Sequence, residues 1–352
     1  MSVIQKSLAG IRHAAGNLVR TAKAIPAAIR EAKADSYFSE QERKPYFSRL
    51  MDNLSWAFRY HESNPFYCLY GLDLVGHSDK EYSDYLSFMN IRNACNHAGK
   101  VDSQTILLRD KFLFYKYMNA NGMPVPEVFA VVRNGVVYDI DLNPMSMDDL
   151  AQKTDYFVKD LDGECASFVK HIANYQEFND VRSKLSKGSY ILQKRMYQCD
   201  EMNVLNPKAI NTMRVITINK DGKPFVFSAL LRVGTEQTGN VDNWAVGGLS
   251  IGIEANGFLK EYGYYKPSYG LKADTHPDTG VVFREFQIPM FQEALDKACE
   301  AHKHFYGVHS IGWDVALSTD GPMFIEGNDN WEISMMQACD RPLKEAWLKA
   351  CE

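Results

Sequence analysis

Asp314 and Glu326 are the residues whose types and spacing point most directly to chemistry. They lie in residues 311–328, where two apolar runs flank Thr319-Asp320-Gly321, a pattern that predicts a β-hairpin with a three-residue loop. In that register Asp314 falls directly opposite Glu326, and Asn328 lies two residues further along the same face. Two opposed carboxylates repel each other, so the pair predicts a divalent cation between them. An all-oxygen set of this kind suits magnesium shared with phosphates.

The same register defines the opposite face of this hairpin. Its pairs are Ser318 with Pro322, Leu317 with Met323, Val315 with Ile325, and Trp313 with Gly327. An apolar face of this kind packs on a core, and that packing holds the register. Two alternatives are an exposed carboxylate pair tolerated on a sheet surface and a pair in which one carboxyl group is protonated.

A second hairpin is predicted over residues 211–232, with the loop Lys220-Asp221-Gly222 and with Asn219 opposite Lys223. One face is polar and the other is apolar. The polar face carries Thr212, Arg214, Ser228 and Arg232, and the apolar face carries Met213, Val215, Phe225, Phe227, Ala229 and Leu231. Two arginines on one face predict a bound anion, because guanidinium groups match phosphate and carboxylate geometry. The alternative is that both arginines pair with acidic side chains of a neighbouring strand.

An acidic, cation-binding hairpin and a basic, anion-binding hairpin together predict phosphoryl transfer. That chemistry needs positioned phosphates and neutralised charge, with little covalent chemistry by the protein itself.

Several motifs in these regions resemble a known family. The acidic hairpin, which ends Ile325-Glu326-Gly327-Asn328, resembles the metal-binding end of ATP-grasp enzymes. Three further segments resemble the branch called sugar-transfer-associated ATP-grasp: Asn211-Thr212-Met213-Arg214, Val241-Asp242-Asn243 with Gly247-Gly248, and His276-Pro277-Asp278-Thr279-Gly280. The resemblance runs from about Asp110 to Asp329, roughly two thirds of the chain.

The resemblance implies a role for each residue of the two hairpins. Asp314, Glu326 and Asn328 would hold two magnesium ions, with Glu326 bridging them. Arg214 and Arg232 would be the catalytic arginines, with Arg214 contacting the γ-phosphate and stabilising the acyl-phosphate and tetrahedral species.

The resemblance also implies an ATP site in the middle of the chain. Lys111 and Lys159 would be the phosphate-binding lysines. The hinge that meets adenine, largely through backbone groups, would be Gln193, Lys194, Arg195 and Met196. The loop that follows the second lysine departs from the family, since residues 160–166 contain several acids and the single glycine Gly163.

The acceptor site is predicted from loops that lie between the two hairpins. Its candidate residues are Asp242, Asn243, Gly247, Gly248, His276 and Asp278. The alternative is that the Gly-Gly pair and the Pro-Asp-Thr-Gly segment are turns. His302, His304 and His309 are interpreted as structural, because helical positions two apart do not share a face.

The fold class predicted from these patterns is α+β, an ATP-grasp fold in three parts. Residues 1–108 form a helical region, residues 109–205 a small α+β lid subdomain, and residues 206–352 an antiparallel-sheet subdomain with the metal site. Residues 46–108 are predicted to be mostly helical, with Trp56, Phe58, Tyr60, Phe66, Tyr67 and Tyr70 in a core. Further predicted helices are residues 109–120, 175–185 and 290–305, and predicted strands are 128–132, 136–138, 156–159 and 190–194.

Residues 1–35 have a charge of their own. Six lysines and arginines against two acids give +4, and apolar residues recur at helical spacing, which predicts a basic amphipathic helix, interrupted before Pro26. One interpretation is docking on an anionic membrane surface or on a membrane-bound partner such as a glycosyltransferase. The other is a helix packed on the body of the protein with a solvated basic face.

The bulk composition indicates a cytoplasmic protein. The chain has 45% hydrophobic residues, 24% charged residues and a net charge of −5, which argues against nucleic acid as the main partner. No apolar run approaches the length of a membrane span or a signal peptide. Seven scattered cysteines match neither a disulfide framework nor a zinc site.

The function implied by the resemblance is an ATP- and Mg²⁺-dependent carboxylate–amine ligase that forms ADP and an amide. Its substrates would be small molecules, an amino acid and a uronic acid sugar or its polymer, in cell-surface polysaccharide biosynthesis. Two alternatives remain, a kinase of the same fold that phosphorylates a sugar hydroxyl and a non-catalytic nucleotide-binding module.

Overall fold

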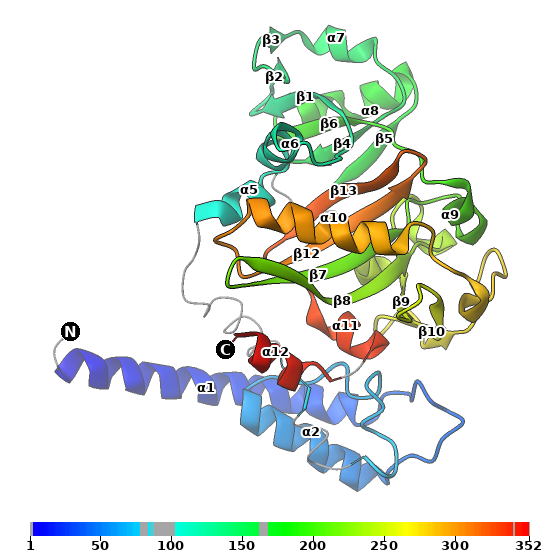
Figure 1. Cartoon of the computed structure of the whole chain (residues 1–352). Coiled ribbons are helices and arrows are strands. Elements are labelled where there is room, and N and C mark those ends of the chain that lie inside the picture. Colours follow the sequence, from blue (N-terminus) through cyan, green and yellow to red (C-terminus); the bar gives the residue numbers. More distant parts are fainter. Residues whose placement is uncertain are drawn as a thin grey trace. The chain divides into compact units, whose positions relative to one another are not determined.

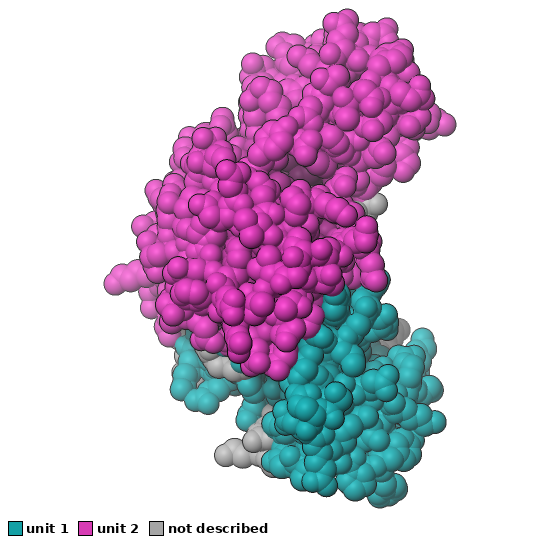
Figure 2. Space-filling view, turned by 90° about the vertical axis from the view of Figure 1, so that its right-hand side faces the viewer, with its two compact units in different colours: residues 1–97, 264–272, 332–352 teal, residues 98–263, 273–331 magenta. Residues whose placement is uncertain are grey.

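The computed structural model describes residues 3–77, 84, 85, 87, 103–161, 168–340 and 342–351. The described residues form helices and two antiparallel sheets, which confirms the predicted α+β class (Figure 1). The chain divides into two compact units (Figure 2): unit 1 is Met1–His97, Tyr264–Lys272 and Glu332–Glu352, and unit 2 is Ala98–Gly263 and Ala273–Trp331. The subdomain boundaries after residues 108 and 205 stay a prediction.

The described part of unit 1 is mainly helical. Its helices are α1 (Val3–Glu31), α2 (Tyr46–Tyr60), α11 (Ile333–Cys339) and α12 (Lys344–Cys351). The predicted interruption of the first helix is wrong, because α1 continues through Pro26. Ala24 and Ala28, which flank this proline, are buried in one cluster with Ala57 of α2, and we attribute the unbroken path of the helix to that packing. Within the described residues, no helix combines the length and apolar character needed to span a membrane.

The predicted aromatic core of residues 46–70 is only partly correct. Trp56, Phe66, Tyr67 and Tyr70 are buried, but Phe58 is 61% exposed because it lies on the outer side of α2. The prediction that residues 46–108 are mostly helical is wrong for residues 61–77, which form turns, while most of residues 78–102 lie outside the described part.

The first sheet of unit 2 belongs to the middle of the chain. Its six strands follow the order β3-β2-β1-β6-β4-β5. They are β1 (Val128–Arg133), β2 (Val136–Asp139), β3 (Pro144–Met145), β4 (Tyr156–Asp160), β5 (Val169–Ile172) and β6 (Tyr190–Lys194). Helices α7 (Met147–Ala151) and α8 (Tyr175–Leu185) pack on one face, and α6 (Lys111–Ala120) packs on the other. The predicted helix 175–185 and strand 190–194 are confirmed, whereas β3, β5 and α7 were missed.

Asp110 lies between two helices, so the predicted helix 109–120 begins two residues later than expected, at Lys111. Helices α5 (Ile106–Arg109), preceded by the 3-10 turn η1 (Ser103–Thr105), and α6 meet at this residue, whose backbone is extended. One carboxylate oxygen accepts hydrogen bonds from the amides of Phe112 and Leu113, both at 3.0 Å. The other accepts from Arg133 at 2.6 Å. Asp110 is therefore the N-cap of α6 and ties this helix to β1.

The second sheet has seven strands in the order β11-β10-β9-β8-β7-β12-β13. They are β7 (Thr212–Lys220), β8 (Lys223–Val233), β9 (Leu249–Ile253), β10 (Leu259–Tyr265), β11 (Lys272–Ala273), β12 (Ser310–Ser318) and β13 (Gly321–Asn328). Helix α10 (Phe291–His304) packs on one face of this sheet, while α9 (Asp200–Leu205) and the 3-10 turns η2 (Glu236–Thr238), η3 (Trp244–Val246) and η4 (Phe283–Glu285) lie in the connections.

Both functional hairpins turn through two residues, so the predicted three-residue loops are wrong. Asp221 and Gly222 both have positive φ, which a two-residue hairpin turn requires, and Ser318 pairs with Gly321 across the other turn. Near the turns the predicted pairs are therefore wrong: Ser318–Pro322, Leu317–Met323, Val315–Ile325 and Asn219–Lys223.

A β-bulge in each hairpin moves the register back by one residue. In β12–β13 the bulge follows Asp314, so Asp314 pairs with Glu326 and Trp313 with Gly327, as predicted. In β7–β8 the bulge follows Ile216, and it leaves Arg214 and Arg232 on a common face. The lid loop 160–166 cannot be compared, since residues 162–167 lie outside the described part.

The Asp110→Ala variant tests the cap of α6. We expect it to lower the free energy of unfolding by about 1–2 kcal/mol, because two helix amides and a guanidinium lose their acceptor. Urea denaturation measures this change. The control is Asp141→Ala, whose exposed carboxylate makes only a 3.8 Å ion pair with Lys116. Equal stability of the two variants would contradict the capping role.

Candidate functional site

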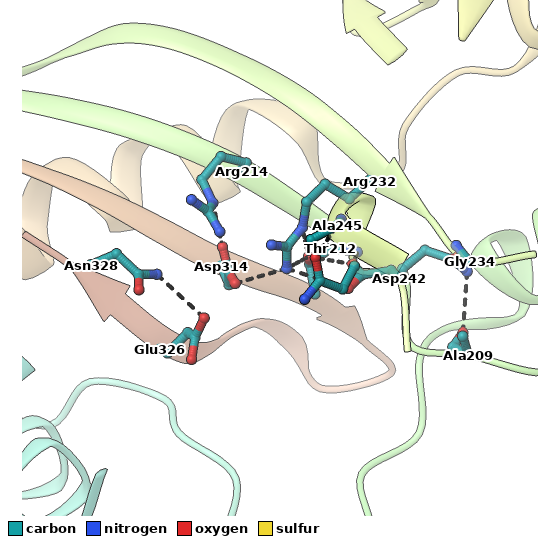
Figure 3. Close-up of polar contacts among 12 residues, drawn as sticks. Ala209, Thr212, Arg214, Arg232, Gly234, Asp242, Ala245, Asp314, Glu326 and Asn328 are labelled. Carbon is teal, nitrogen blue, oxygen red and sulfur yellow. Dashed lines mark hydrogen bonds and ion pairs between the residues drawn. The ribbon is translucent and has the colours of Figure 1, made fainter. Parts of the chain in front are cut away.

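The acidic and basic hairpins are direct neighbours in the second sheet. Strand β12 pairs with β13 on one side and with β7 on the other, so Asp314 lies between Glu326 and Arg214. Arg232, on β8, lies on the same face, where it is paired with Thr212 (Figure 3). The opposite face carries Trp313, Val315 and the other buried residues that pack beneath α10. Alternation along the strands therefore gathers four ionisable side chains on one face.

Asp314 is clamped by both arginines. Its Oδ1 accepts from Arg214 Nε at 2.5 Å, and its Oδ2 accepts from Arg232 Nη2 at 2.7 Å (Figure 3). Burial alone would raise the pKa of Asp314, but the two guanidinium groups outweigh it and hold this pKa below its usual value. In this structure the arginines follow the alternative interpretation, pairing with an acid on a neighbouring strand.

Glu326 has the opposite electrostatic situation. Burial and the adjacent charge of Asp314 raise the pKa of Glu326. Asn328 Nδ2 donates to Oε1 of Glu326 at 3.3 Å (Figure 3). Glu326 is thus the carboxyl group of the row that would gain most from an additional positive charge.

The two arginines differ in how many hydrogen bonds their guanidinium groups donate. Arg232 donates to Thr212 Oγ1, to Asp242 and to Asp314, so it is the centre of a buried network. Thr212 in turn donates its hydroxyl and its amide to Asp242, at 2.5 and 2.9 Å. Arg214 uses only Nε within the described residues, and its terminal nitrogens make no hydrogen bond there. Arg214 is therefore better placed to bind an anion than Arg232.

The first sheet contributes Lys159 and Gln193 from one face. Lys159 of β4 lies opposite Ile191 of β6, and Ile191 belongs to the cluster that packs on α6. Lys159 Nζ donates to Gln193 Oε1 at 2.7 Å. Burial lowers the pKa of Lys159 to about 8; Glu326 acts in the opposite direction, and Lys111 lowers it further. These electrostatic effects link Lys111, Lys159 and Glu326 within unit 2, consistent with a shared anion site.

The side chains of two predicted hinge residues are paired with acids that lie beside the first sheet. Lys194 Nζ pairs with Glu127 at 2.7 Å, and Arg195 pairs with Asp155 at 3.3 Å. Met196 follows them and is half-buried. The backbone amides of Lys194 and Arg195 are also engaged, because they donate to the carbonyl oxygens of Glu127 and Asp155 at 2.8 and 3.2 Å. The role of this segment in binding a base stays a prediction.

Four of the predicted acceptor residues stabilise the local structure through their own hydrogen bonds or backbone conformations. Asp242 is buried against Thr212 and Arg232, and Asn243 caps η3 by accepting from the Ala245 amide at 2.8 Å. Gly247 has φ of +107°, and a Cβ at Gly248 would lie 2.7 Å from the Asp242 carbonyl oxygen. Both glycines are needed by the turn, so their presence alone does not identify a substrate site.

His276 and Asp278 hold the neighbouring loop together. His276 is buried, with Nε2 2.9 Å from the Gly234 carbonyl and Nδ1 accepting from the amides of Asp278 and Thr279. The Asp278 carboxylate accepts from the Glu236 amide at 2.8 Å. The structure brings these two residues beside η2, and the role of both in binding an acceptor stays a prediction.

The structural interpretation of the histidine cluster agrees with the contacts of His302. Its Nδ1 lies 2.7 Å from Thr217 Oγ1 and its Nε2 lies 2.9 Å from the Val308 carbonyl. Burial lowers the pKa of His302 to about 4, so this imidazole is neutral and structural near pH 7.

Two features of the site escaped the sequence analysis. Thr212 was placed on the polar face without a role, yet its hydroxyl joins Arg232 to Asp242. Ser228 Oγ, on the same face, is buried and has no hydrogen-bond partner among the described residues. Period-two alternation places both side chains on the polar face, but the contacts of Thr212 with Arg232 and with Asp242, which lies in a loop, appear only in the folded chain.

Magnesium fits this site by donor chemistry. No group of three or more His, Cys, Asp and Glu side chains that could hold a metal occurs within the described residues. The candidate set instead combines the carboxylates of Asp314 and Glu326 with the amide oxygen of Asn328, all hard oxygen donors. Because both oxygens of Asp314 are held by arginines, Glu326 and Asn328 are the residues readier to coordinate a cation.

Comparisons with solved structures give low similarity. The N5-carboxyaminoimidazole synthase of Aspergillus clavatus, in complex with ADP, has 12% identity and a TM-score of 0.41 over 70% of this chain and 51% of its own. The ATP-grasp ligase PsnB complexed with minimal precursor, Mg and ADP has 15% identity and a TM-score of 0.40 over 70% and 60%. Thus the chain spans about half to two thirds of these structures. No curated protein matches it significantly.

A family model gives the decisive match. The model described as sugar-transfer associated ATP-grasp matches residues 97–346, which include both sheets and every candidate site residue. That range is well over half of the chain, and it contains the motifs from which the resemblance was first seen. The chain therefore belongs to the sugar-transfer associated ATP-grasp family.

Proposed function

We propose that this protein is an ATP- and Mg²⁺-dependent carboxylate–amine ligase. The observation that carries the proposal is the row of Arg214, Asp314 and Glu326 across three neighbouring strands, with Lys159 of the lid in the same unit. Arg214 and Lys159 would bind the negatively charged phosphate oxygens, and the neighbouring carboxylates of Asp314 and Glu326 would bind a cation. Membership of the ATP-grasp family supports the same assignment.

In the proposed reaction a substrate carboxylate attacks the γ-phosphorus of ATP, ADP leaves, and an acyl phosphate forms. An amine then attacks the acyl carbon, phosphate leaves, and an amide is formed. The terminal nitrogens of Arg214 would bind the transferred phosphoryl group, while Arg232 would keep Asp314 in place. Magnesium on Glu326, Asn328 and Asp314 would neutralise charge on the phosphates when bound.

The lid would supply the second half of the phosphate site. Lys159 is already held by Gln193, and its pKa of about 8 leaves it mainly protonated near pH 7. A triphosphate would favour the ammonium form further, since an opposite charge stabilises it. Closing the lid over the acyl phosphate would exclude the water that hydrolyses it.

The proposed substrates follow the family's association with sugar transfer. We propose an amino acid as one partner and a uronic acid sugar, or its polymer, as the other, in polysaccharide biosynthesis at the cytoplasmic side. A glycosyltransferase is the proposed protein partner. The hydroxyl of Ser228, which is buried on the site face and has no hydrogen-bond partner among the described residues, is a group that an acceptor could contact.

An ADP-release assay with pools of amino acids and uronic acid sugars tests the function. ADP release that needs both a carboxylate and an amine, with an amide product in the mass spectrum, is the expected result. Turnover with a sugar that lacks a carboxylate, giving a phosphate ester, would identify a kinase instead. ATP binding without turnover for any acceptor would identify a non-catalytic module.

The Glu326→Gln variant tests the role of the acidic pair in turnover. We expect kcat to fall by about 10²–10³-fold, because the carboxylate best placed to hold the cation is lost. The matched control, Glu236→Gln, changes an exposed glutamate of the same unit and should retain activity. Unchanged ADP release by Glu326→Gln would remove the metal assignment.

The Asp314→Asn and Glu326→Gln variants should differ in stability. Asp314→Asn removes the carboxylate from buried Arg214 and leaves Arg232 with Asp242 alone, so we expect a loss of about 3–5 kcal/mol in the free energy of unfolding. Glu326→Gln removes a carboxyl whose pKa is raised by burial and by Asp314, so its stability at pH 7 should be equal to wild type or higher. Urea denaturation measures the free energy of unfolding of both variants. A similar decrease in both would contradict the charge balance described for the site.

A further inference from the structure

Three consecutive residues, Arg109, Asp110 and Lys111, connect the first sheet with the C-terminal end of β13. The Lys111 amide donates to the carbonyl oxygen of Leu161, directly after β4, at 3.0 Å. The carboxylate of Asp110 fixes the turn between α5 and α6. The guanidinium of Arg109 pairs instead with Asp329, one residue beyond β13. These three residues are therefore bound to both sheets of unit 2.

The ion pair of Arg109 with Asp329 is bidentate. Arg109 Nε donates to Oδ1 at 3.0 Å and Nη2 donates to Oδ2 at 2.5 Å, so both carboxylate oxygens are engaged. Two parallel hydrogen bonds of this kind fix direction as well as distance. The arginine side chain is 57% exposed, so the pair adds little to the free energy of unfolding. Its main effect is to orient the two elements that it joins.

A second contact joins α5 and β13 next to this pair. Leu108, the neighbour of Arg109 in α5, is buried, and a Cβ at Gly327 would lie 2.8 Å from its Cδ2. The absence of a side chain at Gly327 therefore allows α5 to approach the strand closely. Gly327 lies opposite Trp313, on the sheet face away from Asp314. Leu108 consequently contacts β13 from the side opposite the site.

These two contacts flank the residues that are readier to coordinate a cation. Gly327 lies between Glu326 and Asn328 in β13, and both of these side chains project from the site face (Figure 3). Asp329 is the next residue of the chain. The contacts at Gly327 and Asp329 therefore restrict the backbone that carries both potential ligands.

At its other end, the same tripeptide carries Lys111, one of the two predicted phosphate lysines. Lys111 lowers the pKa of Lys159, and Glu326 acts on this pKa in the opposite direction, so the three charges act on one region. A cation bound by Glu326 and by a triphosphate needs the lysines and the carboxylate at a fixed separation. Magnesium makes this demand strict, because it requires near-ideal octahedral geometry.

We propose that Arg109 is a positioning residue for the metal–nucleotide site, acting through Asp329 on the end of β13 that carries Glu326 and Asn328. It keeps these cation ligands at the separation from Lys111 that a magnesium–triphosphate complex needs. The inference rests on the proposed function, because it requires that a metal ion and a nucleotide bind to this face of the sheet.

Binding of Mn²⁺ to the full chain in the presence of the non-hydrolysable analogue AMP-PNP tests the proposal. Electron paramagnetic resonance measures the free Mn²⁺ in the titration. We expect Arg109→Gln to weaken Mn²⁺ binding about tenfold, as the loss of a residue that orients metal ligands does. Electrostatics alone predicts the opposite sign, because removing a positive charge near the site would strengthen cation binding. Arg109→Lys keeps the charge but not the bidentate geometry, so we expect an intermediate affinity.

The matched control is Arg182→Gln, which breaks an exposed arginine–aspartate pair of the same unit. It should leave Mn²⁺ binding unchanged. Because both arginines are exposed, both variants should keep the wild-type midpoint of urea denaturation.

Three results would overturn or limit this assignment. Equal or tighter Mn²⁺ binding by Arg109→Gln, with normal binding by the wild type, would overturn the positioning role alone. Equal weakening by Arg109→Gln and Arg182→Gln would also overturn it, because the effect would not depend on β13. No Mn²⁺ binding by the wild type would contradict the proposed metal site, and the positioning role with it.

Discussion

The balance of two guanidinium groups against two carboxyl groups on one sheet face is the constraint on which the site depends. Asp314 receives both arginines, and Glu326 beside it receives neither as a direct hydrogen-bond donor. A buried charge without a partner is costly, so this row is stable only while its members remain matched. The unequal sharing leaves Glu326 as the point where an added cation stabilises the row. Arg214 keeps its terminal nitrogens for an anion.

The surrounding fold supports this row through packing on the opposite face of the sheet and through hydrogen bonds on the same face. Trp313 lies on the other face under α10, and the lack of a side chain at Gly327 gives its ring room. The bulge after Asp314 corrects the register that the two-residue turn would otherwise impose. On the side, Asp242 and Thr212 hold Arg232 in one position. Lys159, on β4 of the first sheet, adds a positive charge to the same unit.

Local pattern predicted the paired acids, the shared face of the arginines and several elements of the lid, because alternation and turn residues are local signals. It could not predict that β12 lies beside β7, because about 90 residues separate the two strands and the pairing is a tertiary choice. The local pattern also did not predict the two bulges, because a bulge depends on packing between strands and not on residue alternation within one strand. Phe58 was assigned to the core from its residue type alone, although burial depends on which side of α2 meets its neighbours.

A crystal structure with Mn²⁺ and a non-hydrolysable ATP analogue, using anomalous scattering to locate the metal, tests the metal site most directly. We expect an anomalous peak within coordination distance of Glu326, next to Asn328 and Asp314, with the γ-phosphate near Arg214. A peak elsewhere, or a bound nucleotide whose phosphates lie away from this sheet face, would contradict it.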